Sequence, residues 1–139
     1  MTPEQIKHVQ DSFKMVVPIS NLAAEIFYGR LFKIAPHVQP YFKGNMQEQG
    51  QKLMTTLGVV VNGLRDLEKI VPAAEELAVR HVSYGVKAED YAPVGEALIY
   101  ALEAGLEDAF TPEVKDSWIT AFGALSSVMI QAAYPKAAQ

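Results

Sequence analysis

Apolar residues recur along this chain at every third or fourth position, which is the spacing of one face of an α-helix. Four such stripes stand out: Ile6, Val9, Phe13 and Val16; Leu53, Leu57, Val60 and Leu64; Val94, Leu98, Ala101 and Leu102; and Val114, Trp118, Phe122, Leu125 and Met129. The run Leu57-Gly58-Val59-Val60-Val61 has the composition of a strand, but helical spacing continues on both sides of it. The pattern therefore predicts an all-α fold.

Helix starts and stops divide the pattern into segments. Thr2 can pair with Gln5 in a capping box, and Thr111-Pro112-Glu113 repeats the same kind of start. Val71-Pro72 indicates the start of another helix, and Pro135 the end of the last one. We expect helices near residues 3–16, 19–34, 36–41, 46–65, 72–84, 89–109 and 112–134.

Composition limits the chain to one domain of ordinary size. It has 139 residues, of which 50% are hydrophobic and 20% charged, so it can bury a core. The formal net charge is -4 and no basic run occurs, which argues against nucleic acid or an anionic membrane as a partner. We expect a single domain over residues 1–139, with a disordered tail after Pro135.

Cysteine is absent, which excludes disulfides, thiolate metal sites and covalent attachment of haem through Cys-x-x-Cys-His. No apolar run is long enough to span a bilayer. The N-terminus lacks the basic start and apolar core of a signal peptide. These features predict a soluble cytoplasmic protein without a membrane partner.

The chain has three histidines, and only one of them lies in an unusual position. They do not have metal-ligand spacing, and the phosphate-binding and nucleophile-elbow motifs are absent. We expect His8 to face water and His37 to lie at the surface. His81 follows Leu77 by four residues, so it lies on the apolar face of its helix. Taken alone, such a histidine is usually a hydrogen-bonded core residue.

The surroundings of this histidine resemble those in bacterial single-domain globins, the stand-alone relatives of the haem domain of flavohaemoglobins. The resemblance covers roughly Ile6 to Ala133, and the order and spacing of its short segments make it specific. These segments are Phe27-Tyr28-Gly29-Arg30-Leu31-Phe32, Pro36 to Phe42, Gln49-Gly50-Gln51-Lys52-Leu53-Met54, Arg80-His81-Val82-Ser83-Tyr84-Gly85-Val86, Asp90-Tyr91-Ala92-Pro93-Val94-Gly95, Ser117-Trp118 and Ala121-Phe122-Gly123. The resemblance implies a three-over-three globin fold around one non-covalent haem b.

On the proximal side, the resemblance assigns His81 as the protein ligand of the haem iron. Phe42 matches the aromatic residue that packs against the haem face, and its other interpretation is ordinary core. Leu77 is expected under the porphyrin and Val86 near its edge. Ligation needs a neutral imidazole whose other nitrogen donates a hydrogen bond to an acceptor.

One departure from the family pattern concerns the groups behind the proximal histidine. Tyr91 matches the tyrosine that polarises this histidine in flavohaemoglobin-like proteins. The glutamate that accompanies it there falls at Ala133 and is missing. We therefore expect an imidazole with less anionic character, which argues against peroxidase-like chemistry.

On the distal side, Gln49 and Leu53 share one helix face. The resemblance implies that Gln49 is the distal polar residue, Leu53 the apolar residue above the iron, and Tyr28 the tyrosine that donates a hydrogen bond to oxygen. Each donor is worth about 1–3 kcal/mol. Without the histidine match, Gln49 would be a solvated glutamine and Tyr28 a core aromatic. Lys52 either reaches a haem propionate or stays solvated.

The resemblance implies reversible binding of oxygen, carbon monoxide and nitric oxide, with oxygen storage or transport as the leading function. The alternative is a nitric oxide dioxygenase that works with a separate reductase, because the same residues serve both. A haem-free helical interaction domain is the third possibility. The sequence leaves the oligomeric state, the physiological ligand and its affinity open.

Overall fold

The computed structural model describes residues 2–42, 45–83 and 90–133, and every regular element in these ranges is helical. The α-helices are α1 (Pro3–Val16), α2 (Ser20–Ile34), α3 (Met46–Asn62), α4 (Leu67–Ser83), α5 (Tyr91–Leu106) and α6 (Pro112–Ala133). Short 3₁₀ helices lie between them: η1 (Val17–Ile19), η2 (Pro36–Tyr41), η3 (Leu64–Asp66) and η5 (Glu107–Ala109).

The predicted helix starts at both ends of the chain are confirmed. The backbone N–H of Gln5 donates to Thr2 Oγ1 at 3.1 Å, and the backbone N–H of Thr2 donates to Gln5 Oε1 at 2.9 Å, which completes the capping box. At the start of α6, the backbone N–H of Val114 donates to Thr111 Oγ1 at 3.2 Å. These bonds satisfy donors that have no partner inside the helix.

The prediction that a helix begins at Val71-Pro72 is wrong. Helix α4 begins at Leu67, and Pro72 lies inside it. Proline removes one backbone donor and crowds the carbonyl four residues earlier, here that of Glu68. Because Glu68 is an exposed residue of the first turn, water can reach this carbonyl, and the helix tolerates the proline near its start.

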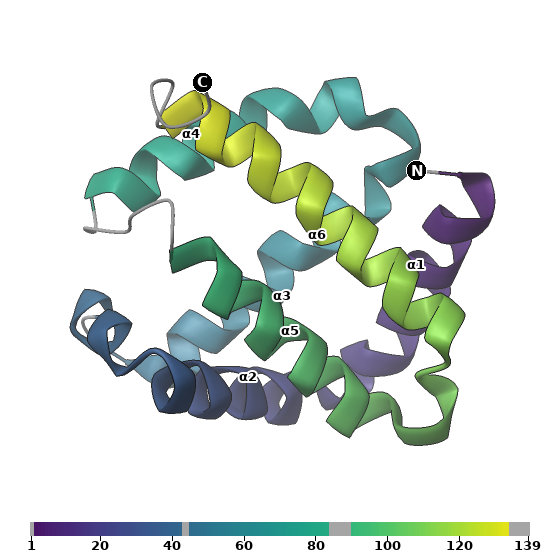
Figure 1. Cartoon of the computed structure of the whole chain (residues 1–139), viewed down its shortest axis with the longest axis horizontal. Helices are drawn as coiled ribbons and strands as arrows, with labels where there is room; N and C mark the ends of the chain where they lie inside the picture. Colours follow the sequence, from purple (N-terminus) through teal and green to yellow (C-terminus); the bar gives the residue numbers. More distant parts are fainter. Residues whose placement is uncertain (1, 43–44, 84–89, 134–139) are drawn as a thin grey trace.

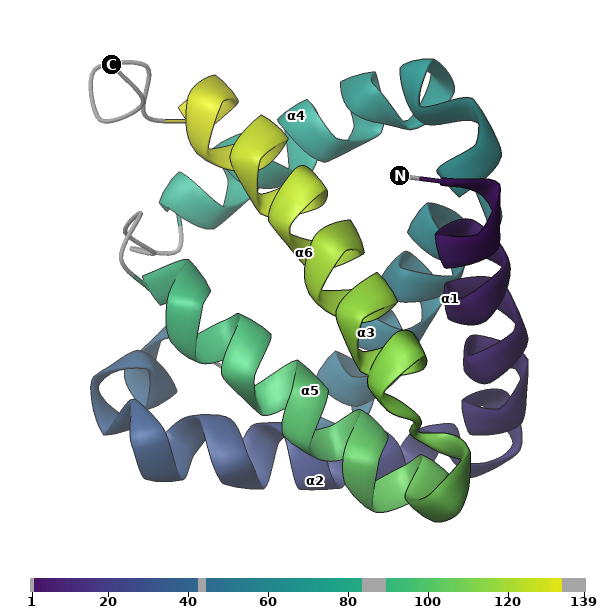
Figure 2. The same ribbon diagram turned by 45° about the vertical axis from the view of Figure 1, so that its right-hand side comes forward.

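Helix α6 lies in front of α1, α3 and α4 in Figure 1, and it packs against α1 and α4. In Figures 1 and 2, α5 crosses α2, and α4 lies beside the C-terminal part of α6. Helix α1 packs against α6 near the N-terminal part of α6 and also contacts α3. This is the three-over-three arrangement that the sequence predicts.

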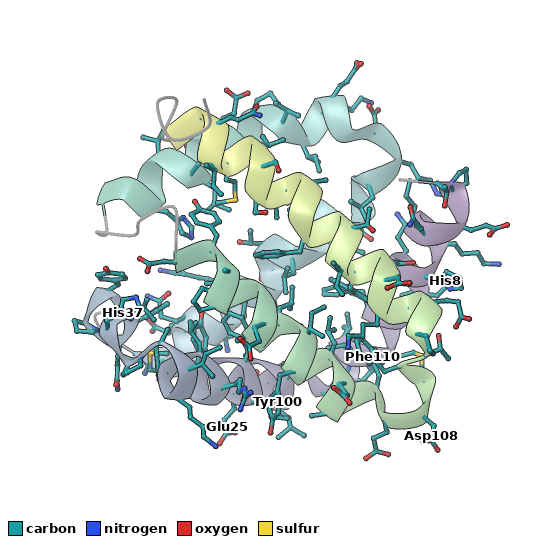
Figure 3. The ribbon with its side chains drawn as sticks, in the orientation of Figure 1. His8, Glu25, His37, Tyr100, Asp108 and Phe110 are labelled. Carbon is teal, nitrogen blue, oxygen red and sulfur yellow. The ribbon has the colours of Figure 1, made fainter. Side chains whose placement is uncertain are left out.

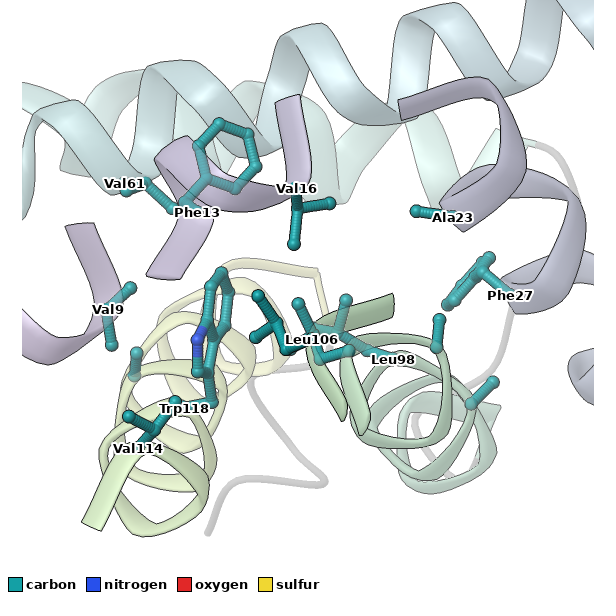
Figure 4. Packing of buried hydrophobic residues seen from close by; sticks show 14 of the residues in the cluster. Val9, Phe13, Val16, Ala23, Phe27, Val61, Leu98, Leu106, Val114 and Trp118 are labelled. Atoms are coloured by element: carbon teal, nitrogen blue, oxygen red, sulfur yellow. The ribbon is translucent and has the colours of Figure 1, made fainter. Parts of the chain in front are cut away.

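The larger part of the core joins α1, α2, α3, α5 and the first half of α6. Figure 4 shows Trp118 at its centre, packed among side chains from α1 and α5. Trp118 is 2% exposed, and its Nε1–H donates to Ser12 Oγ at 2.8 Å. A buried indole N–H without a partner is costly, so this bond favours one position of α6 relative to α1.

A second, smaller cluster of buried residues holds α4 in place. It consists of Ala74 and Ala78 of α4, Tyr91 of α5 and Met129 of α6. The core of the described residues is therefore divided into two clusters. Helix α3 packs in the large cluster and α4 in the small one, although they follow each other in the chain.

The crossing of α2 and α3 depends on Gly50. A Cβ atom on Gly50 would lie 2.9 Å from the Cβ of Ala24, which is closer than side-chain carbons approach. Ala24 Cβ is fixed to the backbone of α2 and cannot move aside. We predict that Gly50→Ala forces the two helices apart and lowers the free energy of unfolding by about 1–3 kcal/mol, as measured by urea denaturation.

Gly123→Ala is the matched control for this prediction. Gly123 is an exposed glycine within α6, and no heavy atom lies within 4 Å of the position of its Cβ. The same change there should raise the free energy of unfolding by up to about 1 kcal/mol, because alanine is the better helix former. Equal stability of the Gly50→Ala variant and the unmodified protein would show that the crossing is not tightly packed.

Candidate functional site

The side chains that were predicted to surround the haem divide between the two core clusters. On the distal side, Tyr28 belongs to the large cluster and Leu53 packs against it; Phe42, the aromatic residue predicted at the haem face, also packs against this cluster. On the proximal side, Tyr91 belongs to the small cluster and Leu77 packs against it. The boundary between the clusters therefore coincides with the boundary between the predicted distal and proximal sides.

His81 has the hydrogen bond that the proximal role requires. Its Nδ1 lies 2.8 Å from the carbonyl oxygen of Leu77, one helical turn earlier. A carbonyl oxygen can only accept, so Nδ1 carries the proton in this bond. In the neutral imidazole the lone pair is then on Nε2, which is the nitrogen that a metal can bind. Helix α4 thus fixes the tautomer of His81 by its own backbone.

The residues at this boundary fit a haem group. Leu53 and Leu77 are apolar side chains that the protein buries only in part, and His81 is also half-buried. A planar apolar ring between the two clusters would cover this surface, and the Nε2 lone pair would be the ligand for its metal. Lys52, next to Leu53 on α3, is exposed to solvent, as either of its predicted roles requires.

Tyr28 lies within a group of aromatic rings and points its hydroxyl at α3. Its ring contacts those of Phe27, Phe32 and Phe42, with centroid distances of 5.0, 5.9 and 5.2 Å. Its hydroxyl donates to the backbone carbonyl oxygen of Gln49 at 3.3 Å. Burial raises the pKa of Tyr28 from 10.0 to about 12, so the hydroxyl keeps its proton at neutral pH and can donate.

The structure thus brings Tyr28 and Gln49 together, and it joins them through the backbone carbonyl of Gln49. The side chain of Gln49 is half-buried, and its amide is not used in this bond. Leu53, one turn further along α3, lines a small apolar cavity of about 10 Å³ together with Phe27 and Trp118. Such a cavity has room for one molecule of about the size of water.

Asp90, the residue before Tyr91, makes a contact with His37 that the sequence does not predict. The Nε2 of His37, an exposed side chain on η2, lies 2.8 Å from Oδ1 of the buried Asp90. The two residues are separated by 53 positions, so no local pattern indicates their contact. The pair ties the segment before Phe42 to the start of α5, where Tyr91 is 7% exposed.

Val86 and Ala133 lie outside and at the end of the described residues, respectively. Ala133 is the last residue of α6, and its side chain is not described. The predicted roles of both, like the ligand-facing roles of Tyr28 and Gln49, stay predictions.

Comparisons with known proteins agree with this arrangement. The family model described as Globin matches residues 25–129. The chain therefore belongs to the globin family, whose members hold haem in a helical fold.

Similar proteins and solved structures also support membership of the globin family. The chain is 33% identical over 107 residues to the "Flavohemoprotein" of Bordetella parapertussis. The aligned residues cover 75% of this chain and 27% of that protein. It is 28% identical over 133 residues to the "Flavohemoprotein" of Rhodopirellula baltica, covering 94% of this chain and 33% of that protein. The chain thus spans between a quarter and a third of the length of these relatives.

A bacterial globin from Campylobacter jejuni matches with a TM-score of 0.85 and 25% identity, covering 99% of this chain and 100% of that one. The predicted three-over-three globin fold and the resemblance to bacterial single-domain globins are thereby confirmed. No helix within the described ranges is long and apolar enough to cross a membrane.

We predict that His81→Gly releases the haem or leaves it weakly held, and that added imidazole restores a five-coordinate ferrous spectrum. The reason is that glycine leaves room for a free imidazole beside the carbonyl of Leu77. Optical spectroscopy of the purified variant measures both effects. His8→Gly and His37→Gly are the controls, and a similar loss of haem in either would argue against His81 as the ligand.

Proposed function

We propose that this protein binds haem b without a covalent bond and reversibly binds oxygen and other diatomic gases there. The observation that supports this most is the hydrogen bond from His81 Nδ1 to the carbonyl of Leu77, which leaves the lone pair on Nε2. The absence of cysteine excludes thioether attachment of the cofactor.

When bound, haem would supply an iron atom that can bind both a protein nitrogen and a diatomic gas. His81 would supply that nitrogen, and the backbone of α4 keeps its Nδ1 proton in place. Leu77 and the small cluster around Ala78 and Tyr91 hold this helix, and the hydrogen bond from Nδ1 to the Leu77 carbonyl restricts rotation of the imidazole. A ligand that is ordered beforehand costs less entropy when it binds.

On the distal face, the chain's own contribution is a set of donors in apolar surroundings. The Tyr28 hydroxyl is protonated and bonded to the Gln49 carbonyl at 3.3 Å, which is long for a hydroxyl hydrogen bond. Such a weak bond is easily exchanged for one to a polar gas ligand. The amide of Gln49 can donate as well. Phe42 and Leu53 keep bulk water away, which strengthens any hydrogen bond made there.

The alternative function is nitric oxide dioxygenation with a separate reductase. The observation that favours it is the match to two proteins named flavohemoprotein, of whose lengths this chain covers 27% and 33%. Consumption of nitric oxide over many turnovers, with a reductase and reduced cofactor present, would support the enzyme. Binding of oxygen without such turnover would support the carrier.

Optical spectra of the purified protein in the ferric, ferrous and carbon monoxide forms test the proposal directly. A Soret band that appears on addition of haemin and shifts with carbon monoxide is the expected result. Failure of haemin to bind would leave a helical interaction domain as the function and overturn the proposal.

We predict that Tyr28→Phe and Gln49→Leu each speed oxygen dissociation, and far more than carbon monoxide dissociation. Oxygen bound to ferrous haem is polar, whereas carbon monoxide is much less so, and only a polar ligand gains from a donor. Loss of about 1.4 kcal/mol corresponds to roughly tenfold in an equilibrium constant. Stopped-flow displacement of oxygen by carbon monoxide measures the rate.

The structure sharpens this test because Tyr28 is bonded to the backbone of Gln49. Gln49→Leu removes the amide and leaves the partner of Tyr28 intact, so the two variants probe separate donors. If both donors act on one ligand atom, the double variant will be non-additive. A change of less than about twofold in both single variants, or roughly 0.4 kcal/mol, would contradict the polar distal pocket.

A further inference from the structure

His37 and Asp90 make a polar contact between the segment that follows α2 and the segment that precedes α5. Nε2 of His37 lies 2.8 Å from Oδ1 of Asp90. Figure 3 labels His37 near the edge of the molecule, beside the start of α5. A carboxylate oxygen accepts hydrogen bonds, so Nε2 carries the proton in this bond. The neutral Nε2–H tautomer and the charged imidazolium can both donate it.

The two partners of this contact differ in burial. The side chain of Asp90 is 7% exposed, whereas that of His37 is 60% exposed. A buried carboxylate needs hydrogen-bond donors, and the imidazole supplies one. Asp90 directly precedes α5, yet its side chain makes no capping bond to that helix. The carboxylate is therefore directed at His37 and not at the start of α5.

The short helix η2 holds His37 in a fixed place beside the large cluster. Ala35 and Val38, which flank it, are 1% and 3% exposed and belong to that cluster. The two prolines of η2 restrict its backbone further. The same helix ends next to Phe42, the aromatic residue predicted at the haem face. His37 is thus connected to the distal side through a stiff segment.

Asp90 belongs to the opposite side of the predicted haem boundary. It directly precedes Tyr91, which is 7% exposed and lies in the small cluster with Ala78 of α4. Tyr91 is also the residue predicted behind the proximal histidine. The contact of Asp90 with His37 therefore connects the small cluster to the large one at the edge of the candidate site.

We propose that the contact of His37 with Asp90 is a latch that holds the distal and proximal sides together and so slows the loss of haem. The inference rests on the proposed function, because it requires haem to bind between the two clusters. Haem that both clusters cover can leave only after they separate at this boundary, and the latch opposes that separation. His37 and Asp90 are thus positioning residues, which act through η2 and α5.

His37→Ala tests the latch because it removes the imidazole and keeps the buried residues on either side. Haemin should dissociate at least about threefold faster than from the unmodified protein, since a hydrogen bond to a carboxylate is lost. Transfer of haemin to an excess of a spectrally distinct haem acceptor measures this rate. His37→Gln should restore the rate to within about twofold of the unmodified protein, because the glutamine amide can also donate to Asp90.

Glu96→Ala is the matched control. Glu96 also lies on α5 and pairs with Arg30 of α2 at 3.4 Å, but the adjacent Ala97 packs in the large cluster, as α2 does. Loss of that ion pair should leave haemin dissociation unchanged. The effects of His37→Ala and Asp90→Ala should be non-additive in the double variant, because the two side chains make one contact. Equal haemin loss from His37→Ala and the unmodified protein would overturn the latch, as would equal acceleration in Glu96→Ala.

Amide hydrogen exchange in the haemin-bound protein gives a readout that does not depend on haemin transfer. The backbone N–H of Phe42 donates to the carbonyl of Gln39 at 3.1 Å, at the end of η2. It should exchange faster in His37→Ala, because η2 loses its tie to α5. In His37→Gln and Glu96→Ala it should exchange at the original rate. Unchanged exchange in His37→Ala would contradict the latch, whereas failure of the unmodified protein to bind haemin would count against the proposed function.

Discussion

The packing of α6 against both core clusters is the constraint on which the site depends. Val114 and Trp118 belong to the large cluster, and Met129 belongs to the small one. The fifteen residue-to-residue steps from Val114 to Met129 rise about 22 Å along a straight helix. One rigid helix thus sets how far the small cluster, and with it α4, lies from the large cluster that contains Tyr28. Helix α5 adds a second tie, because Tyr91 lies in the small cluster and Leu98 in the large one.

Much of the fold can be predicted from the spacing of apolar residues, because each helix buries one stripe. The capping box of Thr2 and Gln5 was also predictable, since it involves residues three apart. The start of α4 was not, because proline marks a helix start only by statistical preference. Whether Pro72 begins α4 or lies within it depends on whether water can reach the carbonyl of Glu68, and this is a property of the folded surface.

Within the candidate site, local contacts can be predicted from the sequence, whereas contacts between distant segments cannot. The bond from His81 to Leu77 spans one helical turn, so a helical pattern predicts that the two lie together. The approach of Tyr28 to Gln49 follows from the resemblance to globins, but a motif cannot choose between a side-chain and a backbone partner. The contact of His37 with Asp90 joins distant segments and depends on how η2 meets α5, which neither composition nor periodicity encodes.

The role proposed for Tyr28 combines core packing with ligand binding. Its ring is 9% exposed and is held among three phenylalanine rings, so its position is determined by packing. A buried hydroxyl without a partner would be costly, and the Gln49 carbonyl provides one. Because that bond is long, the hydroxyl gains little from it and loses little when it turns to another acceptor. The aromatic contacts therefore maintain the position of the ring, while the weak hydrogen bond keeps the hydroxyl exchangeable.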